Sequence, residues 1–215
     1  MTTILSKILA EKATKMPGGL YHKTQIALCY NSNRIEGSRI SEEQTRYIFE
    51  TKTVGFKDEE ALLVDDIIET TNHFAAFDYM LDTIEKDLSN EIIKEFHIIL
   101  KSATTWGHSA GYWWNSVNGH SAISFSPKVE DEMNKLNDWY LNLERVSLDN
   151  IVDYYCTIKN IFGGGQVGRL VMFRECLKNN IVPFIIDCEY YKGLEKSAQD
   201  VYAEWVKYFI PNWTN

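Results

Sequence analysis

The 215-residue sequence predicts an all-α domain with a single β-hairpin. Apolar residues recur mostly at helical spacing, and the capping sequence SEEQ at 41–44 is typical of a helix start. Only residues 111–127 combine β-forming residues with turn residues. The chain has four prolines, 45% hydrophobic residues and no low-complexity linker, so we expect one globular domain over 1–215.

The predicted elements follow in order along the chain. Two helices, over 3–15 and 20–35, precede the helix that opens at the capping sequence and reaches about residue 50. Hydrophobic spacing and capping residues then predict helices over 59–85, 90–102, 128–143, 148–160, 166–179 and 191–209. Asn118-Gly119 signals the hairpin turn, and Pro183 favours an extended segment around it. The domain therefore divides into N-terminal helices, 1–50, and a core, 51–215.

Bulk composition excludes several classes of protein. The net charge of −8 and the pI near 5.2 argue against nucleic-acid partners, because phosphate backbones are bound by lysine and arginine stripes. No apolar run is long enough to span a bilayer, so we expect no membrane partner. The four cysteines lack the C-x-x-C spacing of metal or redox motifs, which indicates reduced thiols in a cytoplasmic protein.

A glycine run at 163–168 is the most distinctive local feature. Gly163, Gly165 and Gly168 match the pattern G-x-G-x-x-G, and Asp187 follows nineteen residues after Gly168, as in a dinucleotide-binding fingerprint. That fingerprint belongs to a sheet of several parallel strands, which the helical pattern of this chain does not favour. A dinucleotide-binding module is therefore kept as an alternative.

A second motif lies in the stretch NSNRIEGS at 31–38. Ser32 and Glu36 are four residues apart, so they share one face of the predicted helix. Gly37 stands where a C-terminal capping glycine would stand, which leaves Glu36 at the negative end of the helix dipole. A carboxylate there needs a cation, which comes either from a distant segment or from a neighbour such as Arg34 or Arg39.

At these residues the sequence resembles one bacterial subgroup of the Fic family. The stretch from Ser32 to Gly37 matches the subgroup's inhibitory pattern S/T-x-x-x-E-G/N, and the stretches 67–81 and 167–187 are also similar. The resemblance runs from about residue 27 to the C-terminus. It implies a Fic-like helical bundle with one β-hairpin flap over a nucleotide site. The implied activity is transfer of AMP from ATP to a hydroxyl group of a target protein.

The family signature H-P-F-x-D/E-G-N-G-R-x-x-R is damaged in this chain. In the family, the histidine acts as general base, the acid holds Mg²⁺, and the glycine amides hold phosphate. Alignment on Gly168 makes Arg169 the second arginine and puts Gln166 in place of the first. About four residues, with the base and the acid among them, are missing between Ile161 and Gly163. We therefore assign no catalytic and no metal-binding residue.

The resemblance still assigns two groups of site residues. Nucleotide binding falls to Gly163, Gly164, Gly165, Gln166, Gly168 and Arg169. The inhibitory segment is formed by Ser32, Glu36 and Gly37. The implied ligands are ATP and Mg²⁺, and the implied partner is a target protein. We expect Glu36 and Arg169 to meet across the fold as a buried ion pair, and we expect weak nucleotide binding without efficient transfer.

The histidines leave one further alternative. All of them lie outside the glycine run in sequence, at positions 22, 73, 97, 108 and 120. His73 lies within a predicted helix and is expected to be a hydrogen-bonded structural residue. A nucleotidyl- or phosphotransferase with a rebuilt site would have to use Lys159, Asp153 or His120.

Overall fold

The structure is a computed structural model that describes residues 3–54, 61–105, 107, 114–117, 120–123 and 127–189. The N-terminal helices are α1 (Ile4–Thr14), α2 (Leu20–Ile35) and α3 (Glu42–Thr51). The core helices are α4 (Val64–Asp82), α5 (Asn90–Lys101), α6 (Pro127–Leu141), α7 (Leu148–Phe162) and α8 (Gly165–Lys178). The described part of the chain is thus mainly helical, as the sequence predicts.

The predicted helix boundaries hold within a few residues, with one larger difference at α4. This helix was expected from residue 59 but begins at Val64, after the extended residue Leu63. Asp65 and Asp66 lie in its first turn, where carboxylates interact favourably with the helix dipole. The helix predicted over 191–209 lies outside the described residues.

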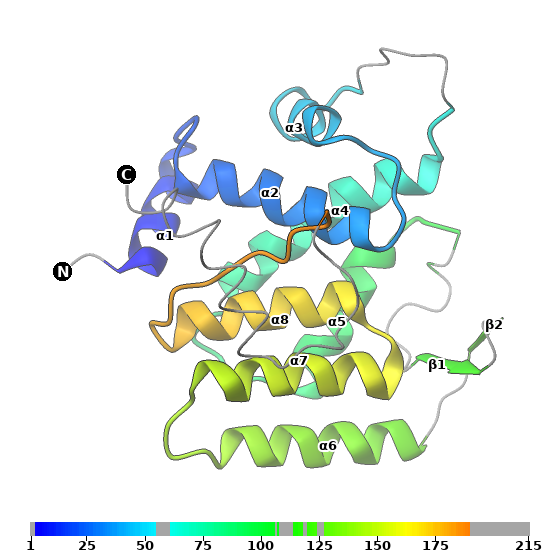
Figure 1. Cartoon of the computed structure of the whole chain (residues 1–215). Coiled ribbons are helices and arrows are strands. Elements are labelled where there is room, and N and C mark those ends of the chain that lie inside the picture. Colours follow the sequence, from blue (N-terminus) through cyan, green and yellow to red (C-terminus); the bar gives the residue numbers. More distant parts are fainter. Residues whose placement is uncertain are drawn as a thin grey trace.

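Two short strands occur in the segment predicted to form the hairpin. Strand β1 (Trp114–Val117) pairs antiparallel with β2 (His120–Ile123), with Val117 opposite His120 and Trp114 opposite Ile123. The two strands lie beside one end of the helical body, near the α7–α8 connection (Figure 1).

Helix α8 lies at the centre of the helical body. Helices α6, α7 and α8 are stacked side by side, and α2 and α4 contact the other side of α8 (Figure 1). Every residue of α8 from Gly165 to Leu177 is buried. A helix enclosed on all sides is normally apolar around its whole circumference, but α8 also carries Arg169, Arg174 and Glu175. Each of these charges therefore needs a partner inside the protein.

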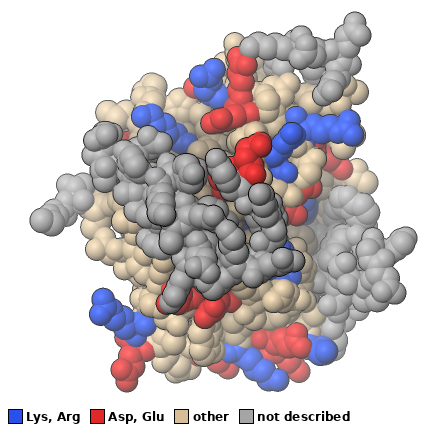
Figure 2. Space-filling model, viewed as in Figure 1, with Lys and Arg blue, Asp and Glu red and all other residues tan. Residues whose placement is uncertain are grey.

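Three further features are the surface charges, the cysteines and the apolar character of the helices. Acidic and basic side chains lie beside one another on the face shown in Figure 2. All four cysteines are free, with Cys29 and Cys176 buried and Cys156 and Cys188 half-buried. No helix in the described ranges is both long and apolar enough to cross a membrane.

Arg174 connects α8 to the turn after α4. Its Nη2 atom donates to the backbone oxygens of Thr83 at 2.7 Å and Lys86 at 2.5 Å. Its Nη1 atom donates to Glu175, whose other oxygen accepts from the Tyr140 hydroxyl at 3.0 Å. Arg174 and Glu175 are both almost fully buried, so their charges are compensated within the core.

We predict that Arg174→Met lowers the free energy of unfolding by about 3–5 kcal/mol, because it leaves Glu175 as a buried charge without its cation. Lys178→Met is the matched control. Its Nζ donates to the same Lys86 oxygen at 2.7 Å, but the side chain is 27% exposed, so we expect a loss of at most about 1 kcal/mol. Urea unfolding measures both values, and equal losses would contradict this account.

Candidate functional site

The glycine run forms a tight turn between two antiparallel helices. Helix α7 ends at Phe162, and α8 begins at Gly165, so only Gly163 and Gly164 connect them. Gly163 caps α7 with a φ of 72°, a left-handed conformation that glycine adopts without strain. This turn places exposed Gly163 at one end of the helical body and the buried first residues of α8 directly behind it.

The dinucleotide-binding alternative is wrong for this chain. The glycine turn follows helix α7, whereas the dinucleotide fold requires a β-strand at that position. The strands among the described residues form only an antiparallel pair. Asp187, the expected ribose ligand, instead accepts a hydrogen bond from the backbone N–H of Glu189 at 2.8 Å.

Arg169 and Glu36 meet across the fold, as predicted. The Arg169 Nη2 atom donates to Glu36 Oε1 at 2.6 Å and to the backbone oxygen of Ser32 at 3.0 Å. Its Nε atom donates to Ser32 Oγ at 2.9 Å. The cation for Glu36 therefore comes from a distant segment, and Ser32 and Glu36 act from the same face of α2.

The ion pair is less buried than the sequence led us to expect. The Arg169 side chain is 2% exposed, but the Glu36 side chain is 40% exposed. Glu36 is the C-cap residue of α2 and precedes Gly37, which has a φ of 96°, so this carboxylate lies at the edge of the fold. The penalty of a fully buried pair does not apply to Glu36, because solvent screens its charge.

The Glu36 carboxylate lies against the first turn of α8. A Cβ atom on Gly165 would stand 2.6 Å from Glu36 Oε1 and 3.1 Å from Arg169 Nη1. A side chain at position 165 would therefore force the ends of Glu36 and Arg169 to shift. The carboxylate occupies the positive end of the α8 dipole, a position that favours anions. This contact compensates its unfavourable place at the end of α2.

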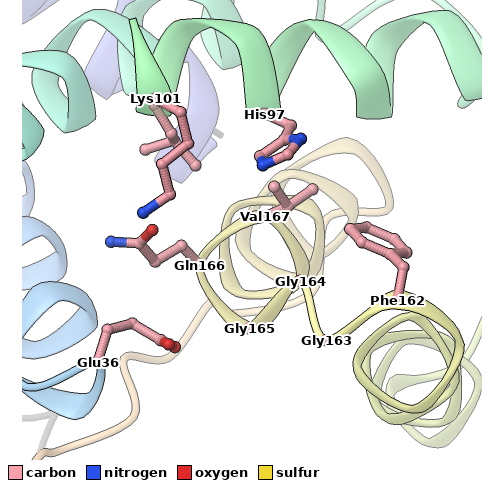
Figure 3. Close-up of a pocket in the computed structure, with 10 residues that line it drawn as sticks. Glu36, His97, Lys101, Phe162, Gly163, Gly164, Gly165, Gln166 and Val167 are labelled. Carbon is pink, nitrogen blue, oxygen red and sulfur yellow. The ribbon is translucent and has the colours of Figure 1, made fainter. Parts of the chain in front are cut away.

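A pocket of about 460 Å³ opens beside this turn. Its walls come from three segments that are far apart in the sequence: the end of α2, the end of α5, and the α7–α8 turn (Figure 3). The lining residues are Glu36, His97, Leu100, Lys101, Phe162, Gly163, Gly164, Gly165, Gln166 and Val167. His97 and Lys101 point from α5 toward the first turn of α8, and Glu36 reaches it from the other side (Figure 3).

The pocket includes some of the predicted site residues and excludes others. Gly163, Gly164, Gly165 and Gln166 line it. Gly168 does not, because it faces α7, where an added Cβ would stand 2.7 Å from Tyr155 Cδ2. The structure thus gives Gly168 a role in close helix packing rather than in the pocket.

Gln166, at the position of the first family arginine, is held by neighbouring side chains. Its Nε2 atom donates to Asn33 Oδ1 at 3.0 Å and to Glu69 Oε2 at 3.3 Å. The other oxygen of Glu69 accepts from Lys101 Nζ at 2.7 Å. Glu69 and Lys101 were not identified from the sequence, because both are ordinary polar residues at helical spacing. Only the packing of α4, α5 and α8 brings them together.

His97 was also missed from the sequence. It was set aside because it lies far from the glycine run along the chain, yet it lines the pocket. His97 and Lys101 are four residues apart, so one face of α5 carries both. Asp153 and Lys159, proposed for a rebuilt site, are not among the lining residues. The side chain of His120 lies outside the described residues.

The described residues do not fit a protein-held magnesium ion. Glu36 and Glu69, the carboxylates nearest the pocket, already bind Arg169 and Lys101. Within the described part of the chain, no three His, Cys, Asp or Glu side chains come together as metal ligands.

His73 lies in the core, close enough to Arg169 for the arginine charge to act on the imidazole ring. The side chain is fully buried, and neither ring nitrogen has a hydrogen-bond partner among the described residues. The expected structural histidine is thus present, but without the expected hydrogen bonds. Burial and, to a lesser degree, the positive charge of Arg169 lower the pKa of His73 to about 3. The imidazole is therefore neutral at physiological pH.

Comparison with known proteins identifies the fold of this chain. No protein-family model matches the sequence, and no curated protein is significantly similar to it. Solved structures of similar fold are found. The chain is similar to a Fic-domain-containing signaling protein from Bacteroides thetaiotaomicron VPI-5482, with a TM-score of 0.63 and 17% identity over 87% of this chain and 78% of that one.

Two further solved structures support the same fold. Fic-1 from C. elegans has a TM-score of 0.64 and 17% identity, covering 99% of this chain and 64% of that one. A Fic family protein from Desulfovibrio desulfuricans G20 has a TM-score of 0.58 and 19% identity, covering 81% and 55%. The chain thus spans less than two thirds of the length of these two proteins. The helical body with its glycine turn has the Fic fold, as the resemblance implied.

We predict that His73 makes stability fall between pH 7 and pH 5. Its folded pKa of about 3 lies below the ordinary histidine value of 6.5, so only the unfolded chain takes up a proton in this range. The expected contribution is a loss of about 2 kcal/mol at pH 5, at about 1.4 kcal/mol per pH unit below the unfolded pKa. His73→Phe should remove this contribution. Urea unfolding at both pH values measures it, and an equal loss in the two proteins would contradict the prediction.

Proposed function

We propose that this chain is a Fic-family protein of the subgroup with an inhibitory N-terminal helix. In this proposal it binds the phosphates of ATP at the α7–α8 turn but does not transfer AMP efficiently. The observation that carries the proposal is the contact between Arg169 and Glu36, at 2.6 Å across 133 residues of sequence. Two residues that the same family resemblance singled out, although they are far apart in the sequence, meet at the first turn of α8.

The phosphate-binding part of the proposal is supported by the chemistry of the turn. The first backbone N–H groups of α8 and its helix dipole favour an anion at Gly165, where Glu36 now lies. The Arg169 Nη1 atom, buried beside Gly165, has no hydrogen-bond partner among the described residues. A ligand phosphate in place of the Glu36 carboxylate would supply an anion to both groups.

The impaired transfer is supported by the shortness of the turn. Two residues between α7 and α8 leave no room for the loop that carries the histidine and the acid in the family signature. Without a base, a protein hydroxyl is a poor nucleophile. Gln166 replaces the first arginine, and a neutral amide lacks the charge for a bidentate phosphate contact.

In this proposal, the β1–β2 hairpin serves as the flap, and the partner is a target protein.

A second candidate function rests on His97. This histidine lines the pocket together with the glycine turn, so a nucleotidyl- or phosphotransferase with a rebuilt site would use it as the general base. The two candidates differ in one observable, since only the second produces a modified protein or a hydrolysed nucleotide.

We predict that Glu36→Gly binds ATP at least about tenfold more tightly than the unchanged chain, because it removes the anion that competes for Arg169 and the α8 N-terminus. Isothermal titration calorimetry with and without Mg²⁺ measures the affinities, and circular dichroism verifies folding. Glu43→Gly is the matched control, since Glu43 lies in α3 and outside the pocket lining. Undetectable binding at millimolar ATP would overturn the proposal.

We further predict that Glu36→Gly does not transfer label from α-³²P-ATP to added protein or to itself. The physical reason is the missing base and first arginine. Labelled product would instead favour the second candidate, and His97→Ala in the Glu36→Gly background should then abolish the label. Label that survives His97→Ala would refute both accounts.

A further inference from the structure

Glu69 holds two side chains of the pocket wall at once. One carboxylate oxygen accepts from Lys101 Nζ at 2.7 Å, and the other accepts from Gln166 Nε2 at 3.3 Å. The Glu69 and Lys101 side chains are 19% and 21% exposed, so this pair is better shielded from solvent than Glu36 is. The lysine that points toward the first turn of α8 is thereby neutralised by a residue of α4.

Two ion pairs therefore border the pocket, and each has one side chain in the lining, Lys101 or Glu36, and one partner behind it. Glu36 pairs with Arg169 on the α2 side, and Glu69 pairs with Lys101 on the α5 side. Figure 3 shows Lys101 and Glu36 approaching the first turn of α8 from different directions. A phosphate at this turn would lie beside the α8 N-terminus and the Arg169 Nη1 atom, which has no hydrogen-bond partner among the described residues.

We propose that Lys101 is a phosphate-binding residue of this pocket and that Glu69 holds its ammonium group away from the ligand position in the unliganded protein. We call this Glu69–Lys101 ion pair the lock. When a polyphosphate binds at the α7–α8 turn, the Lys101 ammonium exchanges the Glu69 carboxylate for a phosphate oxygen. Lys101 then supplies the positive charge that Gln166 lacks. Glu69 keeps its contact with Gln166, so the pocket wall stays in place while the lysine moves.

The ligand class follows from the groups that would contact it. Three groups would contact the ligand: a lysine ammonium, a guanidinium N–H and a helix N-terminus. Together they favour a ligand with several phosphates over a ligand with a single carboxylate. The choice of a phosphate rests on the proposed function. The lock itself rests on the contacts of Glu69, which are independent of Glu36.

The test is binding of inorganic tripolyphosphate at low salt, measured by isothermal titration calorimetry. Glu69→Gln removes the charge and keeps an oxygen for Gln166, and it should bind about tenfold more tightly than the unchanged chain. The gain should disappear in the double variant Glu69→Gln/Lys101→Met. Glu69→Asp, whose shorter side chain no longer reaches both partners, provides a second measure if Glu69→Gln unfolds.

The matched control is Glu130→Gln. Glu130 pairs with Lys94 of the same helix α5 at 2.8 Å, and both side chains are 29% exposed. This variant makes the same change in net charge outside the pocket, so its affinity should change less than about twofold. An equal gain in Glu130→Gln, a gain that survives Lys101→Met, or no gain in either Glu69 variant would each overturn the lock.

This test separates the lock from the proposed function. If Glu69→Gln gains tripolyphosphate affinity and Glu36→Gly fails to bind ATP, the lock stands and nucleotide binding falls. If Glu36→Gly binds ATP and the Glu69 variants gain nothing, the lock falls and the proposed function stands.

Discussion

The burial of Arg169 is the constraint on which the site depends. Arg169 belongs to α8, a helix that is enclosed on all sides, so water cannot solvate its guanidinium group. Ser32 and Glu36 of α2 satisfy most of its hydrogen bonds. The end of α2 is consequently fixed against the start of α8, and this contact closes one side of the pocket. Without it, a charged core helix would be difficult to accommodate.

The same requirement explains the balance of charge around the pocket. Lys101 and Arg169 each have their own carboxylate, although the chain as a whole is acidic. A site arranged in this way needs no ligand to balance these two cations. It also means that an anion must compete with protein carboxylates, so ligand affinity depends on how easily those carboxylates move away.

Most of the fold followed from the sequence, but only part of the site did. Helical spacing and capping residues predicted the helices, since these signals are local. The motif residues predicted the contact of Glu36 with Arg169 because a family pattern links them. Glu69, Lys101 and His97 carry no local signal, and Gly168 fits a motif that packing against Tyr155 explains. Their roles emerge only when helices distant in sequence are placed side by side.

The two-residue connection between α7 and α8 has a consequence for how the protein folds. A short loop loses little entropy on closure, and contacts between adjacent helices are local, so this helical hairpin is suited to form early. Glu36, the partner of Arg169, is 133 residues away in the sequence, so their contact closes a much longer loop of chain. The anion-favouring end of α8 would then exist before its own carboxylate arrives.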